Sequence, residues 1–314
     1  MSPQLNWASP EREGRATNGD RAGCWILLAL ASASRVVLNA TPRRHLAIPP
    51  SSEHPLEEII IDDTLIAELL PEWGAFFDAA ANRDPGHGTS CAAWTTRDIL
   101  AHQAGNAVEL GRVLAAHLDR RAVPETHGFD ERESPFRRIS DDDRLAALQR
   151  VIADLARVLE RGLDEPDTWV PWTGRRMKVA WFGEHMRSEL ILHRWDLVGD
   201  DEQATTHLAQ PWMTTHSVDA VGVPLLRRGG ADLPDAPFTS RLRVADQPDV
   251  ILTGGAQPTI RFAPADSDTQ PDLITDSAAR VLLLWGRQPA DTTRLHSNAG
   301  PEQLGRTRTL LSGY

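Results

Sequence analysis

Glu189 and His193 are the residues whose types and spacing point most directly to chemistry. They lie in the segment WFGEHMRSELILHRWD, residues 181–196, where steps of three and four positions place them on one helical face with Phe182 and Met186. A charge that faces an apolar core must be paired, neutralised or bound to a metal, because unpaired burial is costly. We therefore predict that this face belongs to a functional site.

His102 is a third candidate ligand, from a different helix. Thr95 and Asp98 have the spacing of a helix cap and its reciprocal partner, so a helix is expected to begin directly after Thr95. His102 then lies about one turn inside that helix, among apolar neighbours. Two histidines and a carboxylate, with an open position for water or substrate, are typical of catalytic zinc sites. We predict that one divalent ion, most simply zinc, is bound by His102, Glu189 and His193.

Alternatives to this ligand set stay open. A Glu–His pair four positions apart is often only a weak surface interaction, and a single buried His is more often hydrogen-bonded than metal-bound. His185 is a rival ligand, because it lies four positions before Glu189, but it is one position off the apolar stripe. His117 and His127 have more polar surroundings, and we expect them to be solvated.

Three further residues flank the predicted ligands and are expected to support them. Asp196 follows His193 by three positions, so its carboxylate is placed to orient an imidazole as a second-layer partner. Trp94 and Trp195 lie next to the ligands in sequence, and we expect them to pack the site rather than to touch substrate.

Four amphipathic helices are expected to position these side chains within residues 60–200. The first covers residues 62–80 with a bend at Pro71, the second begins near Thr96, the third runs from a cap at Ser140 to Gly162, and the fourth begins near Arg175. We expect the segment 127–140 to be a charged connection. Helices of this length joined by loops favour a four-helix bundle with inward-facing polar groups.

Residues 202–314 have a different character, typical of a smaller α+β domain. Short runs suited to strands are separated by turn signals, and helices are expected before and after them. The expected strands are 240–245, 250–253 and 259–263, the expected helices are 211–228 and 301–311, and the segment 278–287 is expected to be a buried helix or strand.

Composition excludes several classes of function. The chain has 314 residues, 41% hydrophobic content and a net charge of −11, which argues against non-specific nucleic-acid binding. Cys24 and Cys91 are the only cysteines and have no CxxC spacing, so neither a disulfide framework nor a cysteine zinc site is indicated. We expect a cytoplasmic protein without membrane or nucleic-acid partners, as a monomer or homodimer.

Residues 1–55 are predicted to be a disordered extension, because Pro, Ser, Arg and Glu predominate. Their one apolar run, residues 24–33, is far shorter than the roughly 20 residues that span a bilayer. A secretory signal peptide is the alternative for this run. The region before it is long and charge-balanced, whereas a signal peptide begins with a short positive region.

Two segments of the sequence are similar to a known family. WTTRDILAHQAG, residues 94–105, and SELILHRWDL, residues 188–197, resemble the mycothiol-dependent maleylpyruvate isomerases, which belong to the DinB-like metal-binding four-helix bundles. The ending AARVLLLWGRQPADTTRLHSNAGPEQLGRTRTLL is similar to that family's sterol-carrier-like C-terminal domain. The resemblance covers residues 62–311. It implies a zinc-type ion on the positions of His102, Glu189 and His193, with mycothiol as the thiol cofactor.

The resemblance also implies a reaction. A thiolate that adds to a cis double bond beside a carbonyl makes it a single bond, and elimination after rotation gives the trans isomer. A cationic residue is needed for the substrate carboxylates, and we expect Arg287 first, with Arg97 and Arg306 behind it. Thiol transfer to electrophiles, metal-assisted hydrolysis, a non-catalytic metal- or ligand-binding regulator and a purely structural ion are the alternatives.

Overall fold

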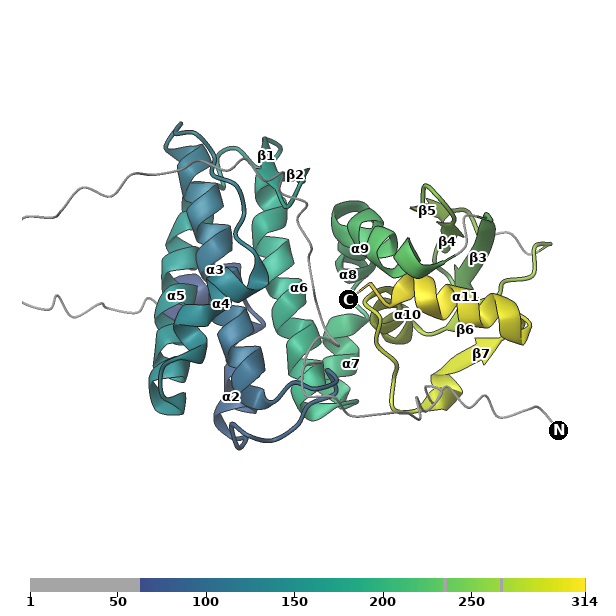
Figure 1. The fold of residues 1–314 in the computed structure, drawn as a ribbon, viewed down its shortest axis with the longest axis horizontal. Helices are drawn as coiled ribbons and strands as arrows, with labels where there is room; N and C mark the ends of the chain where they lie inside the picture. Colours follow the sequence, from purple (N-terminus) through teal and green to yellow (C-terminus); the bar gives the residue numbers. More distant parts are fainter. Residues whose placement is uncertain (1–62, 234–235, 266–267, 314) are drawn as a thin grey trace, which may run out of the picture.

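The computed structural model describes residues 63–233, 236–265 and 268–313, so the expectations for residues 1–55 lie outside the described residues. A helical bundle is followed by an α+β domain, as predicted from the sequence (Figure 1). The bundle helices are α1 (Asp63–Leu69), α2 (Trp73–Ala81), α3 (Thr96–Leu118), α4 (Phe129–Arg137), α5 (Asp141–Arg161) and α6 (Val179–Val198). Helices α1 and α2 together fill the place of the first predicted helix, which is broken around Pro71.

The two caps expected from the sequence are present. The backbone N–H of Thr95 donates to the Asp98 carboxylate over 3.0 Å at the start of α3, which is the reciprocal half of a capping box. Ser140 accepts a hydrogen bond from the backbone N–H of Asp143 and begins α5. The second and third helices therefore start where the sequence places them.

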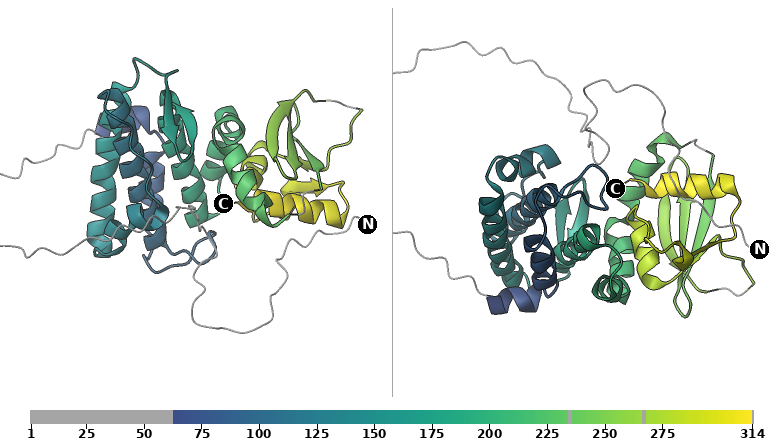
Figure 2. Two further views of the ribbon diagram at one scale, coloured as in Figure 1. Left: turned by 45° about the horizontal axis from the view of Figure 1, so that its top comes forward. Right: turned by 90° about the horizontal axis from the view of Figure 1, so that it is seen from below.

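Helix α6 is buried on nearly all sides because it belongs to two cores. Phe182 and Leu190 pack into the bundle core, whereas Ile191, Leu192 and Trp195 pack into the core of the α+β domain. Figure 2 shows α6 between the bundle and the second domain. The polar face of α6 is consequently not its solvent face but a face directed into the molecule.

Two predictions inside the bundle are wrong. The segment expected to be a connection contains α4, whose only buried residue is Glu133, so the helix carries no apolar stripe that a periodicity search could find. The fourth helix starts at Val179, not near Arg175, because a hairpin precedes it. In this hairpin, β1 (Trp169–Trp172) pairs with β2 (Arg175–Lys178) through Thr173 and Gly174.

The hairpin turn fixes the position of Arg175. Both turn residues have positive φ, 44° at Thr173 and 74° at Gly174, as in the type I′ turns that match the twist of two-residue hairpins. Glycine adopts this conformation without steric cost, whereas a β-branched residue does so rarely. The turn therefore sets Trp172 opposite Arg175 in the strand register.

The α+β domain contains a mixed five-stranded sheet in the order β5-β4-β3-β6-β7, in which only the β3–β6 pair is parallel. Its strands are β3 (Phe238–Arg243), β4 (Asp249–Gly254), β5 (Thr259–Ala263), β6 (Leu273–Thr275) and β7 (Leu295–Ser297). Its helices are α7 (Glu202–Leu208), α8 (Pro211–His216), α9 (Gly222–Gly229), α10 (Ser277–Leu284) and α11 (Pro301–Leu311). A π-helical turn, Ser217–Val221, joins α8 to α9, and short 3-10 turns cover 230–232 and 292–294.

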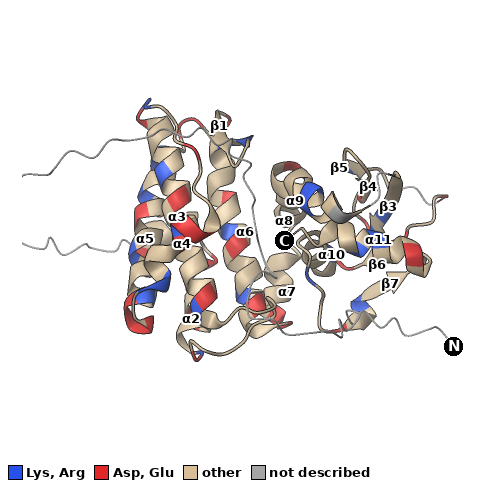
Figure 3. Ribbon diagram, viewed as in Figure 1, with Lys and Arg blue, Asp and Glu red and all other residues tan. Residues whose placement is uncertain are grey.

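Charges of both signs are mixed along the helices. Figure 3 shows acidic and basic residues interspersed along α5, and the sequence of that helix begins with three aspartates and ends with an arginine, as the helix dipole favours. Among the described residues, no helix combines the length and apolarity that crossing a membrane requires.

Candidate metal centre

Three polar side chains meet inside the bundle where α3 and α6 face each other. His102, Glu189 and His193 are all buried, and each offers a ligand atom within 4.8 Å of the other two. Nε2 of His102 lies 3.6 Å from Oε2 of Glu189, and Nε2 of His193 lies 3.2 Å from the same oxygen. The structure therefore brings together the three residues that the sequence predicted as ligands.

The donor set fits a tetrahedral divalent ion. Ligands at about 2.0–2.2 Å from zinc with tetrahedral angles stand roughly 3.3 Å apart, which is close to the two distances around Glu189 Oε2. Both ring nitrogens of His193 are buried and make no hydrogen bond of regular geometry. Two imidazoles and one carboxylate are also the donor types that catalytic zinc uses.

His193 is oriented by a carboxylate that the second domain holds in place. Nδ1 of His193 lies 2.9 Å from Oδ2 of Asp196, as expected from their spacing. Arg287, which follows α10, donates to both oxygens of Asp196 over 2.8 and 2.6 Å. Nδ1 faces this carboxylate, so Nε2 is the nitrogen directed toward Glu189.

His102 has an equivalent partner that the sequence did not reveal. Its Nδ1 lies 2.7 Å from Oε1 of Glu133, on α4, and Arg137 donates to the other carboxylate oxygen over 2.6 and 3.2 Å. The amide of Asn106 contacts Nε2 of His102 over 3.1 Å. With Nδ1 donating to Glu133, Nε2 carries the lone pair and can act as a ligand atom.

The ionisation states of Glu189, His193 and Asp196 follow from the charged groups that each of them contacts. Burial alone would raise the pKa of Glu189, but the neighbouring imidazoles of His102 and His193 bring it well below its ordinary value. Burial would lower the pKa of His193, yet Asp196 and Glu189 raise it to about 9. Asp196 is buried as well, and the Arg287 guanidinium lowers its pKa to about 2. Both carboxylates are therefore ionised at neutral pH.

The cluster opens on a cavity of about 250 Å³ between the bundle and the second domain. Its bundle side includes Trp94, whose ring stacks on His193 at 5.9 Å between centroids and lies 5.0 Å from His102. Its opposite side is apolar and comes from the π-helical turn and α9, through Val221, Pro224 and Leu225. The second domain thus supplies part of the cavity wall.

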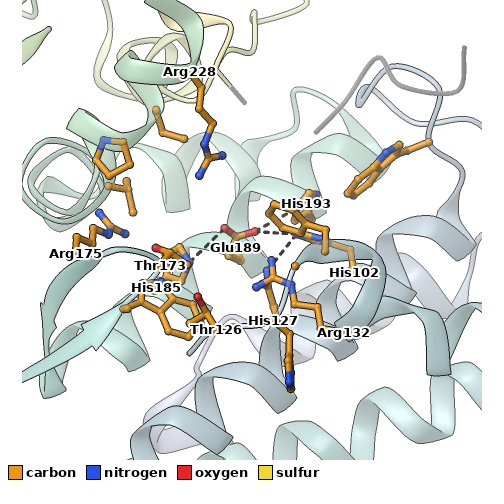
Figure 4. A pocket seen from close by; sticks show the side chains of 18 residues that line it. His102, Thr126, His127, Arg132, Thr173, Arg175, His185, Glu189, His193 and Arg228 are labelled. Atoms are coloured by element: carbon orange, nitrogen blue, oxygen red, sulfur yellow. Dashed lines mark hydrogen bonds and ion pairs between the residues drawn. The ribbon is translucent and has the colours of Figure 1, made fainter. Parts of the chain in front are cut away.

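Three arginines from three elements also line the cavity. Arg132 comes from α4, Arg175 from β2 and Arg228 from α9. Figure 4 shows their guanidinium groups around the space in front of Glu189, with Arg228 reaching in from the second domain. Because the ligand cluster contributes one carboxylate and the cavity rim three cations, the cavity favours an anionic occupant.

Comparisons with known proteins agree with this architecture. Residues 66–198 match the sequence model of the mycothiol maleylpyruvate isomerase N-terminal domain. The helical bundle is therefore similar to the N-terminal domain of this family. Two solved structures are similar to the chain, the mycothiol-dependent maleylpyruvate isomerase and a mutant of it, at 16% and 15% identity and TM-scores of 0.52 and 0.51. Each covers 76% of this chain and 95% of its own. Among curated protein sequences, none matches significantly.

The matched isomerase N-terminal domain contains the three predicted ligands and ends at the last residue of α6. His185, the rival ligand, lies in the cavity wall, with its Nε2 3.7 Å from Oε1 of Glu189, outside the ligand cluster. Its Nδ1 lies 3.4 Å from His216 of α8, and burial lowers the pKa of His185 to about 3. His185 is therefore neutral and lies beside the ligand cluster.

The arginines expected to bind substrate do not line this cavity. Arg287 is committed to Asp196, behind His193. Arg97 pairs with Asp141 on the surface of the bundle, and Arg306 lies over the Phe238 ring in the second domain. The sequence ranked Arg287 first on a family resemblance, whereas the fold places its guanidinium on a carboxylate of α6.

Other expectations for single residues are corrected by their positions. His127 is exposed, as expected, with 40% of its side chain accessible, and it also lines the cavity and contacts the buried Glu109. Trp195 packs in the second domain core and donates to Asp200, so of the two tryptophans only Trp94 packs the site. Arg132, Arg175 and Arg228 were missed because they lie in a helix, a hairpin and a domain that only the tertiary structure brings together.

Proposed function

We propose that the chain is a divalent-metal-dependent and mycothiol-dependent enzyme of the maleylpyruvate isomerase type. Its substrate would be a small electrophilic acid, changed by cis–trans isomerisation or by thiol transfer. The observation that carries the proposal is the position of His102, Glu189 and His193 at one end of a cavity of about 250 Å³ that three arginines line. The similarity of the bundle to the mycothiol maleylpyruvate isomerase N-terminal domain supports the thiol.

The ion, most simply zinc, would be held by His102, Glu189 and His193. When bound, it supplies a positive charge that favours the thiolate form of a nearby thiol. The rest of the site then has to bind the acid, orient its double bond toward the thiolate and exclude water.

The cavity residues are suited to these tasks. Arg132, Arg175 and Arg228 would bind carboxylates, because planar guanidinium groups match the geometry of carboxylate oxygens. Trp94 and Leu225 line the cavity from opposite sides and would keep water from the reacting atoms. The neutral imidazole of His185 is positioned to hydrogen-bond a substrate oxygen.

The isomerisation balances without an external reagent. When bound, the thiol would supply a nucleophile that adds to the cis double bond, with the electron pair taken up by the conjugated carbonyl. Elimination after rotation would give the trans double bond and return the same thiolate. In thiol transfer the carbon–sulfur bond is retained and the carbon takes a proton.

The test measures metal content and thiol-dependent turnover on the same samples. We expect about one zinc or similar ion per chain by elemental mass spectrometry, lost in His102→Ala, Glu189→Ala and His193→Ala. His117→Ala is the matched control, because His117 lies on α3 outside the cluster. Thiol concentration before and after turnover distinguishes isomerisation from transfer.

Two results would contradict the proposal. Protein made with metal supplied that contains none, or metal retained in all three ligand variants, removes the metal site. Turnover of cis-unsaturated acids that is independent of any thiol removes the thiol.

A further inference from the structure

Each candidate ligand histidine is backed by a carboxylate, and each of these carboxylates is held by an arginine. Behind His193, Asp196 is bound by Arg287 through both of its oxygens. Behind His102, Glu133 uses one oxygen for the imidazole and the other for Arg137. The same three-part arrangement thus occurs twice, on two different helices.

The two arginines come from outside the pair of helices that carries the ligands. Arg137 ends α4 and also contacts Asp98, in the first turn of α3. Arg287 follows α10 in the second domain, and its Nη1 donates to the backbone carbonyl of Trp285 over 3.0 Å. Each guanidinium is therefore fixed at a second point.

A carboxylate that an arginine holds in place restricts the orientation of the imidazole ring that it contacts. Asp196 and Glu133 are buried, and each arginine prevents its carboxylate from turning away from the ring nitrogen. The ring plane is then fixed, with Nε2 directed at Glu189 before any ion arrives. Less conformational freedom is lost on binding when the donors are already in place.

The positive charge of the arginines would lower the affinity for a metal ion, whereas their positioning of the carboxylates would raise it. A guanidinium near the site repels a cation, and its removal would leave a more strongly attracting carboxylate behind each histidine. The two effects predict opposite changes in metal affinity. Each carboxylate lies between its arginine and the imidazole. Its negative charge therefore offsets the positive charge of the arginine, which reduces the repulsion between the arginine and a bound cation.

Building on the proposed metal site, we propose that Arg137 and Arg287 are positioning residues that tighten metal binding by holding the second-layer carboxylates. The ion site is then a property of both domains, because Arg287 belongs to the second one. A bundle without that domain would keep all three ligands and lose the support of His193.

The experiment measures the affinity of the full chain for Zn²⁺ and the visible spectrum of the Co²⁺ form. We expect Arg137→Gln and Arg287→Gln each to weaken Zn²⁺ binding about tenfold, the lower end of the range for outer-shell partners. Arg287→Lys should recover part of the affinity, because it keeps the charge but not the two-point contact. The Co²⁺ bands should shift in both Gln variants as the imidazoles turn.

Arg294→Gln is the matched control. Arg294 also binds an aspartate of the second domain through two hydrogen bonds, to Asp276, but that pair contacts neither histidine. We expect unchanged Zn²⁺ affinity and an unchanged Co²⁺ spectrum. Circular dichroism verifies folding, and Arg137 provides the second variant if Arg287→Gln does not fold, because its side chain is 40% exposed.

The outcomes separate this inference from the proposed function. An unchanged protein that binds no Zn²⁺ overturns the metal site and the inference with it. Zn²⁺ binding by the unchanged protein, with equal or tighter binding in Arg137→Gln and Arg287→Gln, leaves the metal site intact and overturns the inference. Unaltered Co²⁺ spectra in Arg137→Gln and Arg287→Gln would also overturn the inference and leave the metal site intact.

Discussion

Arg287 holds Asp196 by two hydrogen bonds of 2.8 and 2.6 Å across 91 positions of sequence. Asp196 in turn contacts the imidazole of His193, so a residue of the α+β domain acts on a candidate ligand in the bundle. The second domain therefore does more than close the cavity. One buried ion pair therefore links the second domain to the candidate metal centre.

Replacement of the cavity arginines should weaken substrate binding. Arg175→Ala and Arg228→Ala are each expected to raise KM for an acidic substrate roughly 10- to 100-fold, because a hydrogen bond to a charged group contributes about 1.5–3 kcal/mol. The change in kcat should be smaller, since these groups contact the substrate in its ground state as well. Steady-state kinetics with the metal-loaded protein measures both constants.

The chain provides a neighbouring control for each of these variants. Arg176 and Arg227 are exposed and do not line the cavity, so Arg176→Ala and Arg227→Ala should leave KM unchanged. If all four variants raised KM equally, general charge attraction and not the cavity would be responsible.

Removal of the metal should leave the bundle folded. Its apolar core extends over α1, α2, α3, α5 and α6, so the helices do not depend on an ion for burial. An ion at 100 times its Kd adds about 2.7 kcal/mol, which corresponds to a fall in Tm of about 5–10 °C when it is removed. Circular dichroism and thermal unfolding with and without a chelator provide the measurement. Loss of the helical signal on chelation would instead identify a structural ion.

The two domains should unfold together, because α6 contributes to both cores. Leu190→Ala removes contacts in the bundle and Leu192→Ala in the second domain, and each should cost about 2–5 kcal/mol. We expect a single transition in which both variants shift the signals of both domains. Calorimetry that resolves two transitions, each sensitive to only one variant, would show that the domains unfold independently.

Asp249 should make stability depend on pH in the acid range. Burial alone would raise its pKa, but hydrogen bonds from Arg243 and Arg241 lower it below the ordinary value. A lowered folded-state pKa contributes stability above the unfolded value, near 4, and that contribution is lost as pH falls through the folded value. Asp249→Asn should therefore reduce the free energy of unfolding by about 1–3 kcal/mol at pH 7.

The same variant should differ less and less from the unchanged protein as pH falls below about 4, because Asp249 is protonated first in the unfolded state and in the folded state only at lower pH. Denaturant unfolding at pH 7, 5 and 3 follows the difference. A gap that stays constant over this range would exclude ionisation of Asp249 as its source.

The sequence by itself determined the three candidate ligands and most of the helices. Glu189 and His193 could be placed on one face because helical spacing is local, and the caps at Thr95 and Ser140 are formed by residues three positions apart. His102 could be added because a His among apolar neighbours is visible in the pattern of one helix. The family resemblance of these two segments also depended on adjacent residues.

Only the tertiary structure decided which side chains surround the ligands. Helix α4 has no apolar stripe and is held by the buried contacts of Glu133, so no periodicity predicted it. Arg175 depends on a two-residue turn, and Arg228 reaches the cavity only because α9 packs beside the bundle. Arg287 was expected to bind the substrate, but its guanidinium binds Asp196 and does not line the cavity. Such contacts join residues that are far apart in the chain. Local sequence patterns depend only on neighbouring residues, so they cannot predict which distant side chains come into contact.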